Sequence, residues 1–334
     1  MTPAELRRLL IEIPDVEVPA QLEGIEESIE YLGSDEAVAS LAEDPYWPKW
    51  ASPWWQMVLL FELGEARRIP ERAVRAMVAA LDALPMHTFP LRPEDWPAGL
   101  HPARHGSCHC ALGSIDQVLT ACGVDVDAEL PWIRAWFVRY QMADGGLNCD
   151  ETAYQVADEC PSSMVGTIAP FEAMLRRGPS DFVERAAGLL VARELVRGSD
   201  TRHNAEEREA AKVWTAPTFP RFYFYDVLRG ATALVRWATE LGRSVPLHAI
   251  APAVTHLATI AGDGVVRVGR QAYARAGTWT RDAGGAWGRV PAADRFPLLE
   301  AVSRVDAPSA RLTAEWRATR RALVELIDAG RVTA

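Results

Sequence analysis

The sequence predicts an all-α protein built from consecutive helical pairs. Apolar residues recur at helical spacing along most of the 334 residues, and no alternating strand pattern of useful length interrupts them. The pairs repeat every 50 to 60 residues, roughly, a period that is typical of repeat or toroid folds. We therefore expect an α/α toroid, or α/α barrel, of about five to six helical hairpins.

Each pair combines two different kinds of helix. SCHCALGSIDQVLTACG precedes AELPWIRAWFVRYQ, and PSSMVGTIAPFEAMLRRG precedes PSDFVERAAGLLVARELV. The first member is rich in small and apolar residues, whereas the second carries more charge. A helix that is apolar on all sides is usually buried, so the first members should face inward and the second members outward.

Helix boundaries are expected where proline, serine or aspartate precedes an apolar periodic segment and where glycine follows one. The first helices are predicted at 3–13, 21–32 and 34–42, and they form a helical extension (1–45) that packs on a single domain spanning 1–334. The remaining helices are predicted, in chain order, at 53–65, 70–84, 107–122, 130–142, 160–177, 180–197, 222–242, 246–260, 293–303 and 309–329.

Composition excludes several classes of protein. No run of about 18 apolar residues is present, and the first residues form an amphipathic helix and lack the features of a signal peptide. We therefore expect no transmembrane segment and a soluble, cytoplasmic protein. The net charge of -10 argues against a nucleic-acid surface. Five cysteines, an odd number, fit a reducing compartment, where structural or metal-binding roles are more common than cross-links.

Aromatic residues gather where two of the inner helices begin. They occur in PYWPKWASPWW and FPRFYFY, and include Trp54, Trp55, Tyr223 and Tyr225. One end of a helical barrel would thus carry an aromatic cup. Large aromatic residues pack in most cores, so the cup either holds an apolar ligand or packs only against itself.

The segment QMADGGLNCDETAYQVADECP (141–161) differs from the helices around it. It contains a Gly-Gly turn, five carboxylates and two cysteines. One interpretation is a solvated turn that ends a helix. The other is the rim of a site in which Asp158 and Cys160 bind a metal ion, although a small buried cysteine is the more usual role of a residue such as Cys160.

Together these motifs resemble a known family. WIRAWFVRYQMADGGL (132–147) is similar to the repeat of the α/α-toroid family that includes squalene-hopene cyclases and protein prenyltransferase β subunits, in which an outer helix precedes a Q-x-x-x-G-G turn. HGSCHCALGSI (105–115) and the triplet Asp158-Glu159-Cys160 look like consecutive segments of the prenyltransferase β subunit. The resemblance covers about 105–240.

The resemblance implies a zinc ion bound by Asp158 and Cys160, and a prenyl diphosphate bound by His105. Departures from the pattern are equally clear. Thr152 and Gln155 stand where the family has its diphosphate Arg and Lys, and the position of the third zinc ligand falls at or near Tyr223. The Asp-x-Asp-Asp motif of the squalene cyclases is missing.

Other polar residues allow a structural and a functional interpretation. His109 is either a core histidine or reaches the cavity beside His105 and Cys160. Asp226 and Arg229 lie three residues apart and favour a local ion pair. Alternatively, Arg221 and Arg229 meet an anionic or diphosphate head in place of the missing Arg and Lys.

We therefore expect a stand-alone enzyme of prenyltransferase or terpene cyclase type, acting on a small isoprenoid or other hydrophobic substrate; a protein partner is not indicated. The alternatives are a non-catalytic toroid that binds hydrophobic ligands and a carbohydrate-active α/α-barrel lyase or hydrolase. Zinc is the one candidate cofactor, with Asp158 and Cys160 as its ligands; the alternative is that no cofactor is bound. The candidate catalytic residues are Asp158, Cys160, His105, His109 and Asp226, and the candidate substrate-binding residues are Trp54, Trp55, Arg221, Tyr223, Tyr225 and Arg229.

Overall fold

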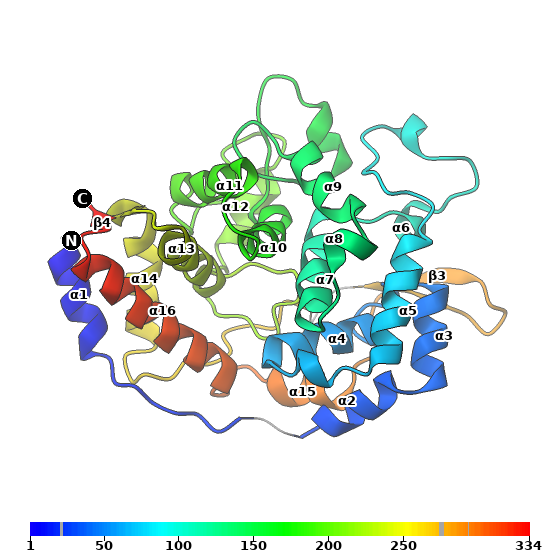
Figure 1. The fold of residues 1–334 in the computed structure, drawn as a ribbon, viewed down its shortest axis with the longest axis horizontal. Helices are drawn as coiled ribbons and strands as arrows, with labels where there is room; N and C mark the ends of the chain where they lie inside the picture. The colour runs from blue at the N-terminus through cyan, green and yellow to red at the C-terminus, as the bar shows by residue number, and fades with distance from the viewer. Residues whose placement is uncertain (21–22, 274–276, 293) are drawn as a thin grey trace.

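The computed structural model describes residues 1–20, 23–273, 277–292 and 294–334, and it is predominantly helical (Figure 1). The α-helices are α1 Pro3–Glu12, α2 Ile25–Leu32, α3 Asp35–Glu43, α4 Pro53–Leu63, α5 Glu71–Asp82, α6 Pro102–His105, α7 His109–Ala121, α8 Val126–Glu129, α9 Trp132–Tyr140, α10 Met164–Leu175, α11 Asp181–Ala192, α12 Ala205–Ala211, α13 Val227–Leu241, α14 Leu247–Ile260, α15 Pro297–Val302 and α16 Ala310–Asp328. Short 3-10 helices are η1 Ala66–Arg68, η2 Pro93–Asp95 and η3 Glu151–Gln155. The prediction of an all-α fold is thus confirmed.

Two small sheets were not expected from the sequence. Strand β1 (Val245–Pro246) pairs in parallel with β4 (Val332–Thr333), and β2 (Thr278–Arg281) pairs antiparallel with β3 (Trp287–Val290). Strands of two to four residues are too short to produce a recognisable alternating pattern.

Most predicted helices are present and begin or end within a few residues of the predicted bounds. The largest shift of a helix start is at α13, which begins at Val227 although the apolar pattern extends back to residue 222, and α11 ends five residues before its predicted end at 197. Asp226 is the N-cap, and its side chain accepts a hydrogen bond from the backbone N–H of Arg229. Just before it, Phe222 has a φ of 54°, which no residue within an α-helix adopts. The short helices α6, α8 and α12 were not predicted.

The helices differ in how they are buried. In α4 and α7 almost every residue from the first turn onward is buried, and α10 is similar. Helices α5, α9 and α11 bury one face and expose the other. A helix that is apolar on all sides needs neighbours on all sides, so α4, α7 and α10 form the interior of the molecule.

The interior helices follow one another in an arc, visible in Figure 1, in which α4 contacts α7, α7 contacts α10, α10 contacts α13 and α13 contacts α16. The closest approach is between α7 and α10. A Cβ at Gly113 would lie 2.3 Å from the backbone nitrogen of Pro170, so only glycine permits this contact.

The first 45 residues pack in two places. Helix α1 lies against α14 and α16, near the C-terminus, whereas α2 contacts α4 and α3 contacts α5. Arg320 of α16 holds α1 by donating hydrogen bonds to the carbonyl oxygens of Leu10 and Ile13. Among the residues that the structure describes, no helix has the length and apolarity needed to cross a membrane.

Candidate functional site

Three thiols come together at the beginning of α7. The Sγ atoms of Cys108, Cys110 and Cys149 all lie within 4.8 Å of one another, and those of Cys108 and Cys110 are 3.4 Å apart. Helix α7 begins only at His109, so Cys108 is the N-cap and has an extended backbone (φ -134°, ψ 163°). Two cysteines separated by one residue would diverge on a regular helix, but here the extended N-cap lets both side chains face the same point.

The loop after α9 supplies the third thiol. Gln141 anchors this loop by donating hydrogen bonds from its side-chain amide to the carbonyl oxygens of Gly145 (2.8 Å) and Phe182 (2.9 Å). Gly145 has a φ of 93°, and a Cβ there would lie 2.1 Å from the carbonyl oxygen of Arg185. The Q-x-x-x-G-G turn therefore fixes the path of the chain that carries Cys149 to α7.

Hydrogen bonds among the three cysteines shift their thiol pKa values in opposite directions. Contacts with Cys110 and Cys149 hold the pKa of the Cys108 thiol well below its usual range. Interaction with Cys108 raises the pKa of both Cys110 and Cys149, and burial adds to this increase. The three sulfur atoms, one of them with a lowered thiol pKa, are a donor set suited to a soft or borderline metal ion such as zinc.

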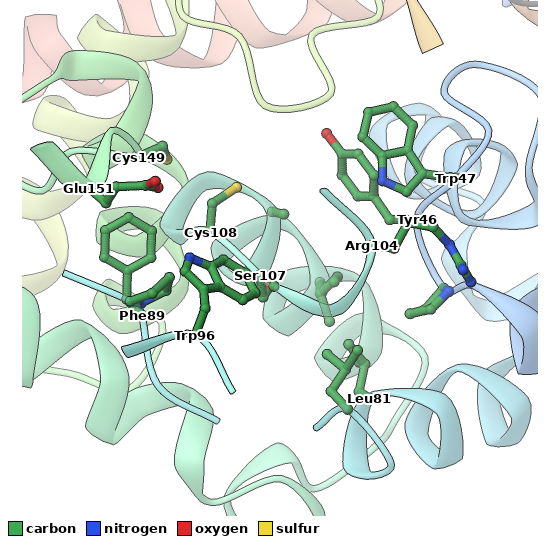
Figure 2. Close-up of a pocket in the computed structure, with 16 residues that line it drawn as sticks. Tyr46, Trp47, Leu81, Phe89, Trp96, Arg104, Ser107, Cys108, Cys149 and Glu151 are labelled. Atoms are coloured by element: carbon green, nitrogen blue, oxygen red, sulfur yellow. The ribbon is translucent and has the colours of Figure 1, made fainter. Parts of the chain in front are cut away.

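Cys108 and Cys149 line an open cavity of about 230 Å³ (Figure 2). In this view Cys108 lies between Cys149 and the pair Tyr46 and Trp47. Most of the wall is apolar. Its apolar members are Pro45, Tyr46, Trp47, Leu81, Leu84, Phe89, Pro90, Trp96, Ala111 and Ile115, and its polar side chains besides the cysteines are Arg104, Ser107 and Glu151.

Arg104 and Asp44 hold one side of this cavity in place. Asp44 is buried and accepts hydrogen bonds from the backbone N–H groups of Tyr46 (3.0 Å) and Trp47 (2.9 Å). Arg104 forms an ion pair with Asp44 at 3.2 Å and stacks over the Trp287 ring at 4.2 Å. Its guanidinium group therefore has a partner already.

Lys49 is enclosed by aromatic rings beside the thiols. Its ammonium group lies 5.3 to 5.8 Å from the ring centroids of Tyr46, Trp47, Trp50 and Tyr223. It also donates a hydrogen bond of 3.0 Å to the Tyr223 hydroxyl. Burial lowers the pKa of Lys49, while Cys110 and Cys108 act to raise it. This lysine is therefore close enough to balance negative charge on the thiols.

The two predicted histidines have structural contacts. His109 is completely buried, accepts a hydrogen bond from Trp136 Nε1 at Nδ1 (2.7 Å), and shares one with the Tyr154 hydroxyl at Nε2 (2.9 Å). Burial lowers its pKa to about 3, so the ring is neutral and both nitrogens are satisfied. His105 Nδ1 accepts a hydrogen bond from the backbone N–H of His101.

Asp158 and Cys160 lie elsewhere. Asp158 has 71% of its side chain exposed and forms an ion pair with the exposed Arg202 at 2.6 Å. Cys160 is half-buried and interacts with Asp144. Within the described residues, neither belongs to a group of three or more side chains that could hold a metal ion. The side chains that the structure brings together and that could hold a metal ion are thus different from the pair that the resemblance implied.

The predicted aromatic residues are mostly core. Trp54 and Trp55 are each 1% exposed and Tyr225 is fully buried, with its hydroxyl donating to the carbonyl oxygen of Leu195. Tyr223 is half-buried and binds Lys49. Tyr46 and Trp47, at the start of PYWPKWASPWW, line the thiol cavity together with Phe89 and Trp96, which lie outside the two predicted aromatic segments.

Arg221, Asp226 and Arg229 form a buried ion network. Arg221 pairs with Asp226 at 2.9 Å and with Glu315 of α16 at 2.8 Å, and Arg229 pairs with Glu172 of α10 at 2.6 Å. Burial would raise the pKa of Asp226, but Arg221 holds it below its usual range. An ion pair between Asp226 and Arg229 was one of the two interpretations of the sequence. In the structure Asp226 pairs with Arg221 and Arg229 with Glu172, and the backbone N–H of Arg229 donates a hydrogen bond to Asp226.

Sequence reasoning did not identify Cys108, Cys110 and Cys149 as one cluster. The available signal was the spacing Cys-x-Cys at the start of one inner helix, together with a cysteine just after the Gly-Gly turn of the next repeat. Comparison with protein-family models, curated proteins and solved structures found no match to this chain.

Proposed function

We propose that this chain is a zinc-dependent enzyme of the α/α-toroid type that activates a nucleophile, a thiol or water, against an apolar substrate. The observation that carries the proposal is the convergence of three thiols, two of which, Cys108 and Cys149, line an aromatic-walled cavity. Catalytic zinc sites have three protein ligands and one position left for a small molecule, whereas structural sites have four.

The donor set fits this use. Cys108 is already favoured as a thiolate, and the three Sγ atoms lie close enough to bind one ion. When bound, a zinc ion lowers the pKa of a water molecule or thiol in its fourth position. Three thiolates leave the centre with excess negative charge, which the nearby Lys49 ammonium group balances.

The apolar side chains of the cavity wall would bind the substrate and would not take part in the reaction. Tyr46, Trp47, Phe89 and Trp96 offer flat apolar surface, and a water-poor wall strengthens electrostatic interactions at the thiols. An apolar chain of the isoprenoid kind matches this lining. The cation pair expected to bind its diphosphate, Arg221 and Arg229, is occupied by internal carboxylates, so the proposal does not depend on a diphosphate leaving group.

The toroid part of the proposal rests on the interior helices. α4, α7, α10, α13 and α16 contact one another in succession, and side chains from all of them line one central cavity. Such convergence is expected when inner helices surround a common axis. It agrees with the family resemblance of the Q-x-x-x-G-G turn.

The alternatives receive less support. A carbohydrate-active barrel needs two carboxylates free to act across the cavity. Glu172 is bound by Arg229, and Glu315 by Arg221, so these carboxylates are not free. A non-catalytic binding toroid would not need three converging thiols, although it would use the same apolar wall.

Metal content and metal-ligand variants test the proposal. The full chain, purified without chelator, should contain about one zinc per chain, and Co²⁺ substituted for it should give the intense charge-transfer absorption of thiolate ligands. Cys108→Ser and Cys149→Ser should lose both signals. Cys122→Ser is the matched control, because Cys122 lies outside the cluster and its thiol donates to the carbonyl oxygen of Ala66.

Cys160→Ser separates the two metal hypotheses. Zinc that persists in Cys149→Ser but disappears in Cys160→Ser would contradict the cluster and return the site to Asp158 and Cys160. A protein that binds no zinc when reduced and reconstituted would overturn the zinc part of the proposal altogether.

A further inference from the structure

The three cysteines at the beginning of α7, here called the thiol cluster, differ in how accessible they are. Cys108 and Cys149 line the open cavity of about 230 Å³, and Figure 2 shows both side chains at its wall. Cys110 is only 6% exposed and does not line the cavity. A small molecule in the cavity therefore reaches the sulfur atoms of Cys108 and Cys149 and is kept away from Cys110.

The two accessible sulfur atoms are close enough to form a disulfide bond. All Sγ atoms of the cluster lie within 4.8 Å of one another, so those of Cys108 and Cys149 need to approach by no more than about 3 Å to reach bonding distance. Cys108 is the extended N-cap of α7, and Cys149 lies in the loop before η3. Neither lies inside a helix, so both side chains can turn toward each other.

Cys110 is a less suitable partner for Cys108. It belongs to the first turn of α7, only two positions along the chain, although the two Sγ atoms are 3.4 Å apart. A disulfide bond between these two residues would close over one intervening residue and distort the beginning of the helix. The geometry thus favours a bond between Cys108 and Cys149, which joins α7 to the loop after the Gly-Gly turn.

The cavity wall indicates which molecules reach these thiols. It is mostly apolar and presents aromatic surface from Tyr46, Trp47, Phe89 and Trp96. Its Arg104 already forms an ion pair within the protein. An uncharged molecule with an apolar group matches such a wall better than an anion or a small polar molecule does.

We propose that the thiol cluster reduces an organic hydroperoxide, with Cys108 as the attacking residue and Cys149 as the residue that completes a disulfide bond. Cys108 is placed to attack because it lies at the N-terminus of a 13-residue helix, where the backbone N–H of Ala111 donates a hydrogen bond to its sulfur. The proposal needs no metal ion and does not depend on the zinc proposal.

The reaction consists of two displacements at sulfur and oxygen. The Cys108 sulfur attacks the terminal oxygen of the hydroperoxide, the O–O bond breaks, and the leaving alkoxide takes up the Cys108 thiol proton to become an alcohol. Cys108 is then a sulfenic acid. The Cys149 sulfur attacks this sulfur atom, the S–S bond forms, and the hydroxyl group leaves as water with the Cys149 proton. The two thiols together lose two electrons, and the hydroperoxide gains them.

Oxidation of the reduced, metal-free full chain with one equivalent of cumene hydroperoxide tests the proposal. The chain should lose two of its five free thiols, counted with a chromogenic thiol reagent after unfolding. Mass spectrometry of a non-reduced digest should find a cross-linked peptide that contains Cys108 and Cys149, and dithiothreitol should restore both thiols. Disulfide bonds between chains, or at Cys122 or Cys160, would overturn the proposal.

Cys110→Ser and Cys149→Ser are a matched pair of variants. Cys110→Ser should still form the disulfide bond, whereas Cys149→Ser should stop at the sulfenic acid of Cys108, which dimedone traps. A disulfide bond between Cys108 and Cys110 in the parent chain, or an unchanged loss of two thiols in Cys149→Ser, would overturn the role of Cys149.

A comparison of two oxidants tests the class of substrate, with glutathione as the reference for their intrinsic reactivity. The preference of the chain for cumene hydroperoxide over hydrogen peroxide should exceed that of glutathione by at least about tenfold, because the aryl group is buried against the cavity wall. A preference no greater than that of glutathione would overturn the assignment to organic hydroperoxides.

Zinc provides a separate test, because it binds thiolates and not a disulfide. The zinc-loaded chain should be oxidised more slowly than the metal-free chain, and the oxidised chain should bind no zinc until it is reduced. Formation of the disulfide bond in a chain that never binds zinc would contradict the zinc proposal and support this one.

Discussion

The two cavities differ in what their polar groups are bonded to. In the central cavity, the buried Arg221 and Arg229 are fully engaged with carboxylates from other helices, so they stabilise the fold. In the thiol cavity, the sulfur atoms of Cys108, Cys110 and Cys149 interact with one another, and those of Cys108 and Cys149 also accept hydrogen bonds from backbone N–H groups. A buried charge with its partner is structural, whereas three thiols that could hold a metal ion, two of them lining an apolar cavity, are candidates for a binding site.

The largest effect is expected from a substitution that breaks the charge pairing at the central cavity. Arg221→Ala leaves Asp226 and Glu315 buried without their cation and should lower the free energy of unfolding by about 3–5 kcal/mol, measured by urea denaturation. Arg202→Ala is the comparison, because its ion pair with Asp158 is exposed and should contribute about 1 kcal/mol or less. Similar losses in the two variants would show that burial does not distinguish these pairs.

The next effect concerns Glu62, which lines the central cavity. Burial raises its pKa from 4.5 to about 7, so the folded chain holds a proton that the unfolded chain releases between these values. The contribution of Glu62 to the free energy of unfolding therefore falls by roughly 3 kcal/mol as the pH rises from 4.5 to 7. Outside that window it is constant.

Glu62→Gln should remove this dependence. Relative to the parent, the variant should gain roughly 3 kcal/mol of unfolding free energy between pH 4.5 and pH 8, measured by urea denaturation at both values. Because variant and parent are compared at the same pH, the titration of all other groups cancels. If the unfolding free energies of variant and parent differed by the same amount at both pH values, Glu62 would be ionised in the folded chain, held so by Arg221 and Arg229.

A third prediction concerns the ligands of the thiol cavity. Loss of a residue that only hydrogen-bonds to a metal ligand typically weakens metal binding by about 10–100-fold. Cys149→Ser removes a proposed ligand itself, so it should weaken zinc binding by more than this, as measured by competition with a chelator. Trp136→Phe removes a hydrogen bond to His109 without touching a thiol, and should weaken it less. Equal effects would place the metal nearer to His109 than to Cys149.

The smallest effect is expected at the predicted zinc pair. Asp158→Ala should leave the zinc content unchanged and should alter the free energy of unfolding by about 1 kcal/mol or less, because Asp158 is exposed and forms its ion pair with the equally exposed Arg202. Loss of zinc in this variant would favour the assignment that the family resemblance implied.

Helix positions were predictable because they depend on local chemistry. The period of apolar residues and capping residues such as Ser180 and Ser309 are encoded within a few positions of each helix start. The start of α13 was less predictable, because the apolar segment before Asp226 is held out of the helix by contacts with Glu62 and the left-handed backbone at Phe222.

The amino-acid pattern was enough to predict that the chain is helical, that some helices are apolar on all sides and that a Gly-Gly turn follows α9. The contacts between side chains from distant segments became visible only in the folded chain. Cys149 reaches Cys108 because Gln141 and Gly145 fix a loop against α11, and Asp158 points to Arg202 because its segment crosses the surface. Spacing along the chain constrains contacts within a helix, but contacts between segments 40 residues apart depend on how the helices pack.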